Sequence, residues 1–489
     1  MQVAITDIDR RLGHTGRAFD MLTERKAVTS VTSASVQSFY VHEEQLQLFA
    51  ANGSKLPSLN AATHVHQQRS KRARLATLLA GELNFHGEDS SYASHDVHAF
   101  AAKFPPQLPR VFIRGLTAPN DVVLDPMMGS GTAVVEALLE GRRGVGLDID
   151  PLALHLSWVK TMPSSIDGLR EAGHRVIAQA HALLSQGTIE SSLAQRFDDR
   201  TKAFVDYWFL PTTQCELMAL VLAIESVTDL SARRFLALTF SSIIITKSGG
   251  VSRARDLAHS RPHLDKTKVP KNALRQFALR LQKNLTSIAR LKMYGTVVAP
   301  LAGDARLMPF ADGVIDLIVT SPPYANAIDY MRAHKFSLVW LGESVVHLSK
   351  LRAEYIGSEQ IKGAQYAVLP ERPEAIIRQL AARDDHKAGI LRKYFTEMKS
   401  VLAEMYRVLR SDAAAIIVVG PSVMRDINVQ THHCLADIAA ELGFDVVAVV
   451  QRALDRNKRM MPARFGKKTD SMIEQRMHEE FVIGLLKPA

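Results

Sequence analysis

Cysteine is nearly absent from this chain of 489 residues, which contains only Cys215 and Cys434. Two cysteines can form neither a disulfide framework nor a four-cysteine zinc site. There is also no run of about eighteen uncharged apolar residues, and the first residues lack the basic and then apolar pattern of a secretory signal. These absences argue against a secreted disulfide-rich protein and against a membrane protein, and we expect a cytoplasmic one.

Signatures of metal or hydrolytic chemistry are missing as well. Histidines occur in pairs, at positions 64 and 66, 95 and 98, and 432 and 433, but no cysteines or acids accompany them at ligand spacing. We therefore expect no bound metal. No Ser-His-Asp arrangement and no pair of catalytic carboxylates competes with the motifs described below.

Positive charge is in excess, with 60 Lys and Arg against 50 Asp and Glu and a formal net charge of +10. A mildly basic solvated surface and a polyanionic partner explain this excess equally well. The cations gather in two segments that are poor in acids and interrupted by Gly or Pro, at 253–271 and 452–468. Loops of this kind suit contact with phosphates.

The order of apolar runs indicates an α/β protein. A chain of this length is too long to fold around a single compact core. From about residue 95, strands and helices alternate, which predicts a largely parallel sheet. We expect a crossover helix at 133–139, closed by Gly141, and strands at 122–124, 144–147, 296–300, 317–320, 414–419, 445–450 and 480–486. The last two strands have only a basic segment between them, so we expect an antiparallel hairpin there.

Two stretches interrupt the alternation. Residues 152–292 are strongly helical without a convincing strand, and 343–395 are rich in charge. We divide the chain into an N-terminal extension, mostly helical or irregular (1–94), the first half of the core domain (95–160), a helical insertion (161–295), the second half (296–342), a second insertion (343–395) and the C-terminal part of the sheet (396–489). Within the extension, 75–80 is the clearest helix.

The first motif, Asp125-Pro-Met-Met-Gly-Ser-Gly-Thr132, follows an apolar run. Gly129 and Gly131 permit positive φ and let backbone N–H groups approach a ligand carboxylate at a helix N-terminus. Asp148, at the end of the next strand, can accept hydrogen bonds from both hydroxyls of a ribose. A purely structural turn is the alternative interpretation. Asp150 precedes Pro151 and is expected to be the N-cap of the following helix.

The second motif, Ser321-Pro-Pro-Tyr324, also follows an apolar run. Its two prolines fix φ and remove two backbone donors, so the loop presents acceptors. The Ser321 hydroxyl and the Pro322 carbonyl can hold the N–H groups of an amine, and Tyr324 offers an aromatic face to a base removed from the helical stack. A rigid loop with a core tyrosine is the alternative.

Together these motifs resemble the DNA amino-methyltransferases, which use S-adenosylmethionine to methylate cytosine N4 or adenine N6. The resemblance covers about 95–160 and 296–342, and 400–487 loosely. It implies a class I methyltransferase-like (Rossmann-like) fold, with a mostly parallel seven-stranded sheet, a C-terminal antiparallel hairpin and a large helical insertion. The segment 102–109 resembles the one that folds over the methionine end of the cofactor in these enzymes.

The resemblance and the motifs give three sets of candidate residues. Met128, where many relatives have an aromatic residue, can pack against adenine, and Asp304 follows the third strand, where the adenine amine would lie. The cofactor set is Lys103, Phe104, Asp125, Pro126, Met128, Gly129, Gly131, Thr132, Asp148 and Asp304. The catalytic set is Ser321, Pro322, Pro323 and Tyr324. The DNA-binding set is Arg253, Arg255, Lys268, Arg456, Lys458 and Arg459.

Family members with serine in the first position of the second motif mostly methylate cytosine N4, so we expect a site-specific cytosine-N4 DNA methyltransferase. Three alternatives remain: adenine N6, an RNA base, and a nucleic-acid-binding protein without catalysis. The intact Ser321, Tyr324 and Asp148 argue against the last. The expected partners are double-stranded DNA and a cognate restriction endonuclease, with no membrane, and 246–275 is the preferred target-recognition region.

Overall fold

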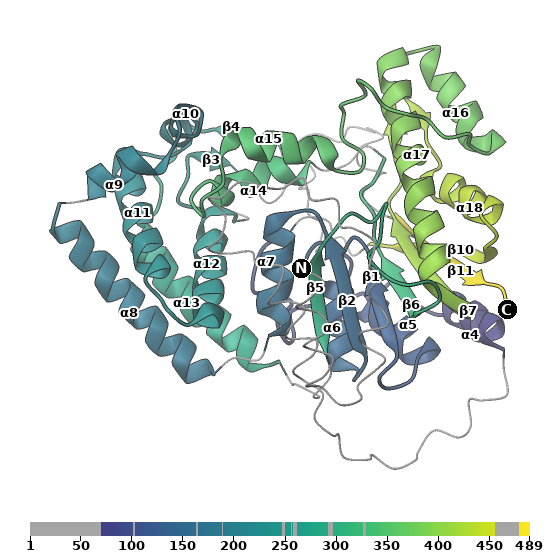
Figure 1. Cartoon of the computed structure of the whole chain (residues 1–489), viewed down its shortest axis with the longest axis horizontal. Coiled ribbons are helices and arrows are strands. Elements are labelled where there is room, and N and C mark those ends of the chain that lie inside the picture. Colours follow the sequence, from purple (N-terminus) through teal and green to yellow (C-terminus); the bar gives the residue numbers. More distant parts are fainter. Residues whose placement is uncertain are drawn as a thin grey trace, which may run out of the picture.

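The computed structural model describes residues 70–100, 103–162, 165–187, 189–246, 250–255, 257, 262–291, 297–325, 329–454 and 479–489. A single large sheet lies at the centre of this part of the chain, with helices on both faces (Figure 1). A body of helices extends from one edge of the sheet. The first 69 residues, which make up most of the expected N-terminal extension, lie outside the described residues.

The sheet has seven strands in the order β10-β11-β7-β6-β1-β2-β5. Six of them run in the same direction, and only β11 is reversed, antiparallel to both of its neighbours. The strands are β1 (Val122–Asp125), β2 (Arg143–Asp148), β5 (Val298–Ala302), β6 (Ile315–Thr320), β7 (Leu409–Val419), β10 (Asp445–Ala453) and β11 (Glu479–Lys487). All seven predicted strands and the hairpin are confirmed, and the order is that of a class I methyltransferase-like sheet.

The central strands are apolar because both of their faces are covered. Every residue of β1 and β6 is buried, the pattern of a parallel sheet between two helical layers. One layer contains α4 (Lys71–Leu79), α5 (Gln107–Leu116), α6 (Thr132–Leu139) and α7 (Pro151–Thr161). The other contains α17 (Asp385–Val408) and α18 (Thr431–Glu441). Helix α4 confirms the helix that was predicted within the N-terminal extension.

The crossover helix α6 has the expected limits. It follows Gly131, which has a left-handed backbone, and it ends before Gly141, whose φ is 71°. Its buried Ala133 and Ala137 pack against the sheet. The glycine loop is therefore held between a buried strand and a buried helix.

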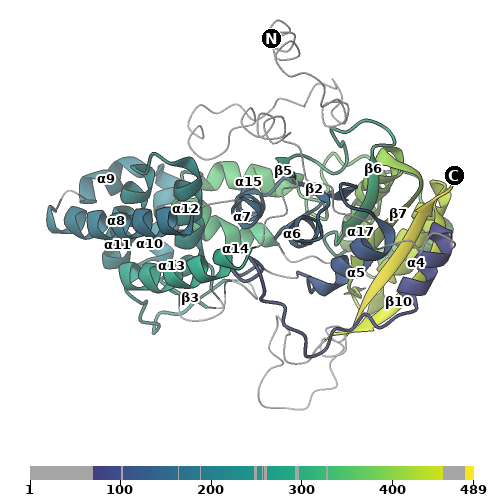
Figure 2. The same cartoon turned by 90° about the horizontal axis from the view of Figure 1, so that it is seen from below.

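The helical insertion forms its own hydrophobic core beside the β5 edge of the sheet (Figures 1 and 2). Its helices are α8 (Ile166–Ser185), α9 (Ile189–Arg196), α10 (Asp199–Trp208), α11 (Pro211–Glu225), α12 (Leu230–Ile244) and α13 (Ala273–Ala289). The expectation that no strand occurs here is wrong, because β3 (Ala254–Arg255) pairs with β4 (His263–Leu264). Strands of two residues are too short to show alternation in the sequence.

The remaining elements surround the carboxyl ends of the strands. They are α14 (Tyr330–Leu338), α15 (Val345–Glu354), α16 (Glu371–Ala381), β8 (Val423–Met424) and β9 (Ile427–Asn428). Among the described helices, none alone has the length and apolar character needed to cross a membrane. Helices α10 and α11 meet that criterion only as a pair, which is bent by 118°.

Candidate active site

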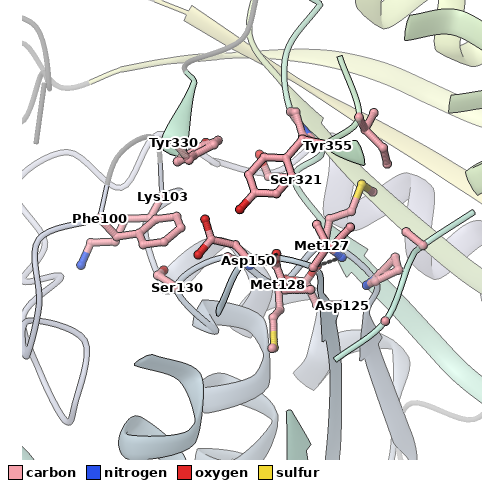
Figure 3. Close-up of a pocket in the computed structure, with 18 of the residues that line it drawn as sticks. Phe100, Lys103, Asp125, Met127, Met128, Ser130, Asp150, Ser321, Tyr330 and Tyr355 are labelled. Atoms are coloured by element: carbon pink, nitrogen blue, oxygen red, sulfur yellow. Dashed lines mark hydrogen bonds between the residues drawn. The ribbon is translucent and has the colours of Figure 1, made fainter. Parts of the chain in front are cut away.

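A pocket lies at the carboxyl ends of β1, β2, β5 and β6, where ligands bind in open α/β sheets (Figure 3). It encloses about 880 Å³ of empty space, part of which is open to solvent. The strand-end loops contribute residues 125–130, 148–150, 303–305, Ser321 and Pro323. Other segments contribute Phe100, Lys103, Phe104, Thr132, Tyr330 and residues 354–356.

The glycine loop adopts the backbone that its sequence predicts. The φ angles of Gly129 and Gly131 are 46° and 69°. A Cβ atom on Gly129 would lie 3.1 Å from Phe100, and one on Gly131 would lie 2.5 Å from the Ser157 hydroxyl. Gly131 is the N-cap of α6 and supplies no side-chain acceptor, so the first-turn N–H groups are left for another partner. A carboxylate fits this position.

Asp148 connects the glycine loop to the end of β2. One of its oxygens accepts from the Gly129 N–H at 2.8 Å, and the other accepts from the Asp150 N–H at 2.9 Å. Burial, reinforced by the charge of Asp150, raises the pKa of Asp148 to about 7. Each carboxylate oxygen can accept a further hydrogen bond, which the two hydroxyls of a ribose would supply.

Asp150 is the N-cap of α7, as the sequence predicts, with its side chain accepting from the N–H groups of Leu152 and Ala153. It also accepts from His334 of α14 at 2.6 Å, a contact between the two halves of the domain. Although burial alone would raise it, the imidazole of His334 holds the pKa of Asp150 below its usual range. Figure 3 shows the hydroxyl of Tyr355 pointing toward Asp150.

Asp304 lies at the end of β5 and lines the pocket, as expected from the sequence. Both of its oxygens accept from Arg306, at 2.6 to 3.0 Å. Arg306 also donates to Glu397 of α17 at 2.8 Å and to the Glu354 carbonyl at 2.9 Å. The carboxylate is therefore fixed by a network that joins β5, α17 and the segment carrying Tyr355.

The segment before the glycine loop covers one side of the pocket. Lys103 and Phe104 line it, and the Lys103 ammonium donates to the His95 carbonyl at 2.6 Å. Phe100 stacks on Tyr330, with ring centroids 5.4 Å apart. Sequence reasoning missed this aromatic pair, although both residues lie in segments whose resemblance to the family was recognised.

Asp125, Pro126 and Met128 also line the pocket. Burial raises the pKa of Asp125 to about 7, and its side chain accepts from the Met127 N–H at 3.2 Å. Met128 is 3% exposed and packs against Val134. Met128 therefore forms part of the pocket wall.

The second motif begins directly after β6. Ser321 and Pro323 line the pocket, whereas Pro322 is buried and Tyr324 is half-buried beside it. The Tyr324 hydroxyl donates to Glu480 of β11 at 3.1 Å. The two motifs, almost 200 positions apart in the sequence, therefore open onto one cavity.

The candidate DNA-binding residues are only partly within the described residues. Arg255 pairs with Asp265 at 2.8 Å, the Lys268 ammonium donates to the Ala254 carbonyl at 2.7 Å, and Arg253 donates to the Tyr207 carbonyl. All three side chains therefore make contacts within the β3–β4 ribbon or between it and α10. Arg456, Lys458 and Arg459 lie outside the described residues. Arg452, placed in the same basic segment by its sequence position, is 3% exposed, so the expectation that it belongs to an exposed phosphate-binding loop is wrong.

The arrangement fits S-adenosylmethionine in each of its parts. The uncapped start of α6 suits the methionine carboxylate, and Asp148 suits the ribose. Met128, Ile149 and Ile356 provide apolar surface for a purine ring near Asp304. Across the residues that the structure describes, no cluster of three or more His, Cys, Asp or Glu is placed to hold a metal ion.

Comparisons with known proteins agree with this geometry. Residues 9–157 match a family model described as DNA methylase. The chain is 22% identical to the type II methyltransferase M.MvaI of Kocuria varians over 383 residues, which cover 73% of this chain and 83% of that protein. It is 21% identical to M.BsoBI of Geobacillus stearothermophilus over 347 residues, covering 61% and 68%.

A shorter stretch is more similar. Over 56 residues the chain is 48% identical to the type II methyltransferase M.BglI of Bacillus subtilis, covering 12% of this chain and 16% of that protein. The fold, the shared pocket and these matches support an S-adenosylmethionine-dependent amino-methyltransferase family, whose matched members are type II methyltransferases.

Proposed function

We propose that this enzyme transfers a methyl group to the N4 amine of cytosine within a specific sequence of double-stranded DNA. The observation that carries the proposal is the position of Ser321 and Pro323, which line one pocket with the glycine loop and Asp148. A base that enters beside Ser321 would place its amine next to the cofactor site. Serine at the first motif position favours cytosine over adenine.

The reaction does not depend on a strong general acid or general base from the protein. When bound, S-adenosylmethionine supplies an electrophilic methyl group on a sulfonium. The Ser321 hydroxyl and the Pro322 carbonyl would accept the two N–H groups of the amine, which leaves its lone pair free to attack. The Tyr324 ring would stack on the extruded base. After transfer, the surplus proton of the amine leaves to solvent, so positioning and desolvation provide most of the catalysis.

Recognition of DNA is assigned to the basic segments. We propose that the ribbon bearing Arg253, Arg255 and Lys268, together with Arg456, Lys458 and Arg459, contacts phosphates around the target. The 246–275 region is the proposed target-recognition element. Because the relatives are type II methyltransferases, we propose a cytoplasmic role in DNA modification beside a cognate restriction endonuclease.

The test is to identify the modified base directly. DNA from a methylation-deficient host that expresses the protein is hydrolysed for nucleoside mass spectrometry and sequenced by a methylation-sensitive method. N4-methylcytosine at one recurring sequence is the expected result. N6-methyladenine would contradict the choice of base, and methylation confined to RNA would contradict the choice of substrate. DNA from cells with the Tyr324→Ala variant is the control.

A further inference from the structure

The Tyr324 side chain is held from two sides by parts of the chain distant in sequence. Its ring packs against Gly420, the residue that follows β7, and a Cβ atom on Gly420 would lie 2.6 Å from Cε2 of Tyr324. The φ of Gly420 lies outside the left-handed region, so glycine is required here because a side chain would overlap the Tyr324 ring and not because of the backbone conformation. Any larger residue here would displace the ring.

The hydroxyl of the same tyrosine is held by a buried ion pair. It donates to Oε1 of Glu480 at 3.1 Å, and Oε2 of Glu480 accepts from the Arg452 guanidinium. Arg452 donates in addition to the Leu83 carbonyl at 2.9 Å and the Asn84 carbonyl at 3.3 Å. The acceptor of the tyrosine is therefore fixed by β10 and by the segment after α4.

The protonation states agree with this geometry. Burial, and then the negative charge of Glu480, raise the pKa of Tyr324 well above its ordinary value, so the hydroxyl remains a donor. A buried ion pair often contributes little net stability compared with apolar packing of the same volume. A role in orienting Tyr324 accounts for a charged pair at the edge of the catalytic loop better than a role in stability does.

We propose that Glu480, Arg452 and Gly420 are positioning residues that fix the ring plane of Tyr324 for stacking on the extruded base. The inference rests on the proposed function, since it concerns how the base is held. The ring edge is set by the backbone at Gly420, and the ring rotation is set by the hydroxyl through Glu480. Neither Glu480 nor Arg452 needs to touch the base or the cofactor.

A double-mutant cycle tests this proposal. The single-turnover rate of methyl transfer from labelled cofactor to plasmid DNA from a methylation-deficient host is measured for Tyr324→Phe, Glu480→Gln and the double variant. Removal of the hydroxyl should lower the rate about 3- to 10-fold. If Glu480 acts through this hydroxyl, Glu480→Gln should have little further effect once Tyr324→Phe is present. Cofactor affinity by calorimetry should stay unchanged in all three.

The Gly420→Ala variant tests the same role without removing either member of the Glu480–Arg452 ion pair. It should lower the rate roughly 10-fold or more, because the ring must move, while thermal stability and cofactor affinity change little. Glu479→Gln is the matched control, because Glu479 precedes Glu480 in β11 and its carboxylate accepts from Gln451 instead. Its rate should equal that of the wild type.

The outcomes separate this inference from the proposed function. If the wild type transfers no methyl group to DNA, the proposed function fails. If the wild type transfers methyl but Tyr324→Phe and Gly420→Ala match its rate, the positioning role is overturned and the proposed function stands. Additive effects of Tyr324→Phe and Glu480→Gln would also overturn it, because they would show that Glu480 acts independently of the hydroxyl.

Discussion

Single carboxylates at the ends of neighbouring strands define the cofactor side of the pocket. Asp148 is the most informative, because the glycine-loop backbone and the next turn both donate to it. Its two hydrogen bonds place it where β2 ends, as the sequence predicts. The contact between Asp150 and His334, in contrast, joins residues 184 positions apart and has no signal in the local sequence.

Replacing Asp148 should weaken cofactor binding. Asp148→Ala removes an acceptor for the ribose and also frees the Gly129 N–H, so we expect binding to weaken by ~1–3 kcal/mol, the usual cost of a charge-assisted hydrogen bond. Calorimetry with S-adenosylmethionine measures it. Asp167→Ala is the control, since this carboxylate is exposed on α8 and pairs with Arg170. Equal affinity for a folded Asp148→Ala variant would remove Asp148 from the cofactor site.

The same residue predicts a pH dependence. Burial and Asp150 raise the pKa of Asp148 to about 7, so the free carboxyl is partly protonated near neutral pH. A ribose diol donates to the ionised form, so cofactor affinity should rise with pH between about 6 and 8, by at most about tenfold per unit. Asp125 has a similarly raised pKa, so Asp148→Asn is the necessary comparison. A slope that persists in Asp148→Asn would assign the titration to another group.

At the scale of elements, the apolar runs of the sequence were sufficient to predict the sheet. The contacts that loops make with the pocket could not be predicted in this way. β1 and β6 are fully buried, and burial on both faces forces the continuous apolar sequence that made them recognisable. The β3–β4 ribbon has two residues per strand and no such signal. Tyr355 and Ile356 reach the pocket from an insertion, and only tertiary packing on α17 brings them there.

Helix α17 should control that segment through Glu397. Its carboxylate accepts from Arg306 at 2.8 Å and from the Gly357 N–H at 3.0 Å. Glu397→Ala should free both Asp304 and the segment at 354–358, and weaken cofactor binding by ~0.5–1.5 kcal/mol. Calorimetry is again the measurement. Glu441→Ala on α18, whose exposed carboxylate pairs with Lys399, should have no effect, and equal affinities for the two variants would contradict the link.

For the whole molecule, the sheet order brings distant residues to one edge. Tyr324 and Glu480 are 156 positions apart and meet because β11 inserts between β7 and β10. The sequence predicted a C-terminal hairpin and two pocket-forming motifs. It could not predict which side chains β11 presents to the catalytic loop, because that depends on the register of β11 against β7.

The basic clusters of the chain should contribute much of its affinity for DNA. Neutralising Arg456, Lys458 and Arg459 together should flatten the log–log salt dependence of DNA binding by roughly two to three units, at ~0.9 for each phosphate that no longer faces a cation. In the ribbon, Arg253 and Lys268 also donate to backbone carbonyls, so their replacement would affect local structure as well as charge. Fluorescence anisotropy over a salt series measures the slope. An unchanged slope would exclude this cluster from the DNA interface.

The central claim is that the Ser321-Pro-Pro-Tyr324 loop holds the base whose amine is methylated. Single-turnover methyl transfer from labelled cofactor to DNA tests it most directly, with the wild type, Ser321→Ala and Tyr324→Ala. We predict that Tyr324→Ala loses most of the rate while cofactor affinity is retained, because a base stack worth ~1–3 kcal/mol belongs to the substrate side. Ser321→Ala should lower the rate constant more than DNA affinity. Transfer by Tyr324→Ala at the wild-type rate would contradict the claim.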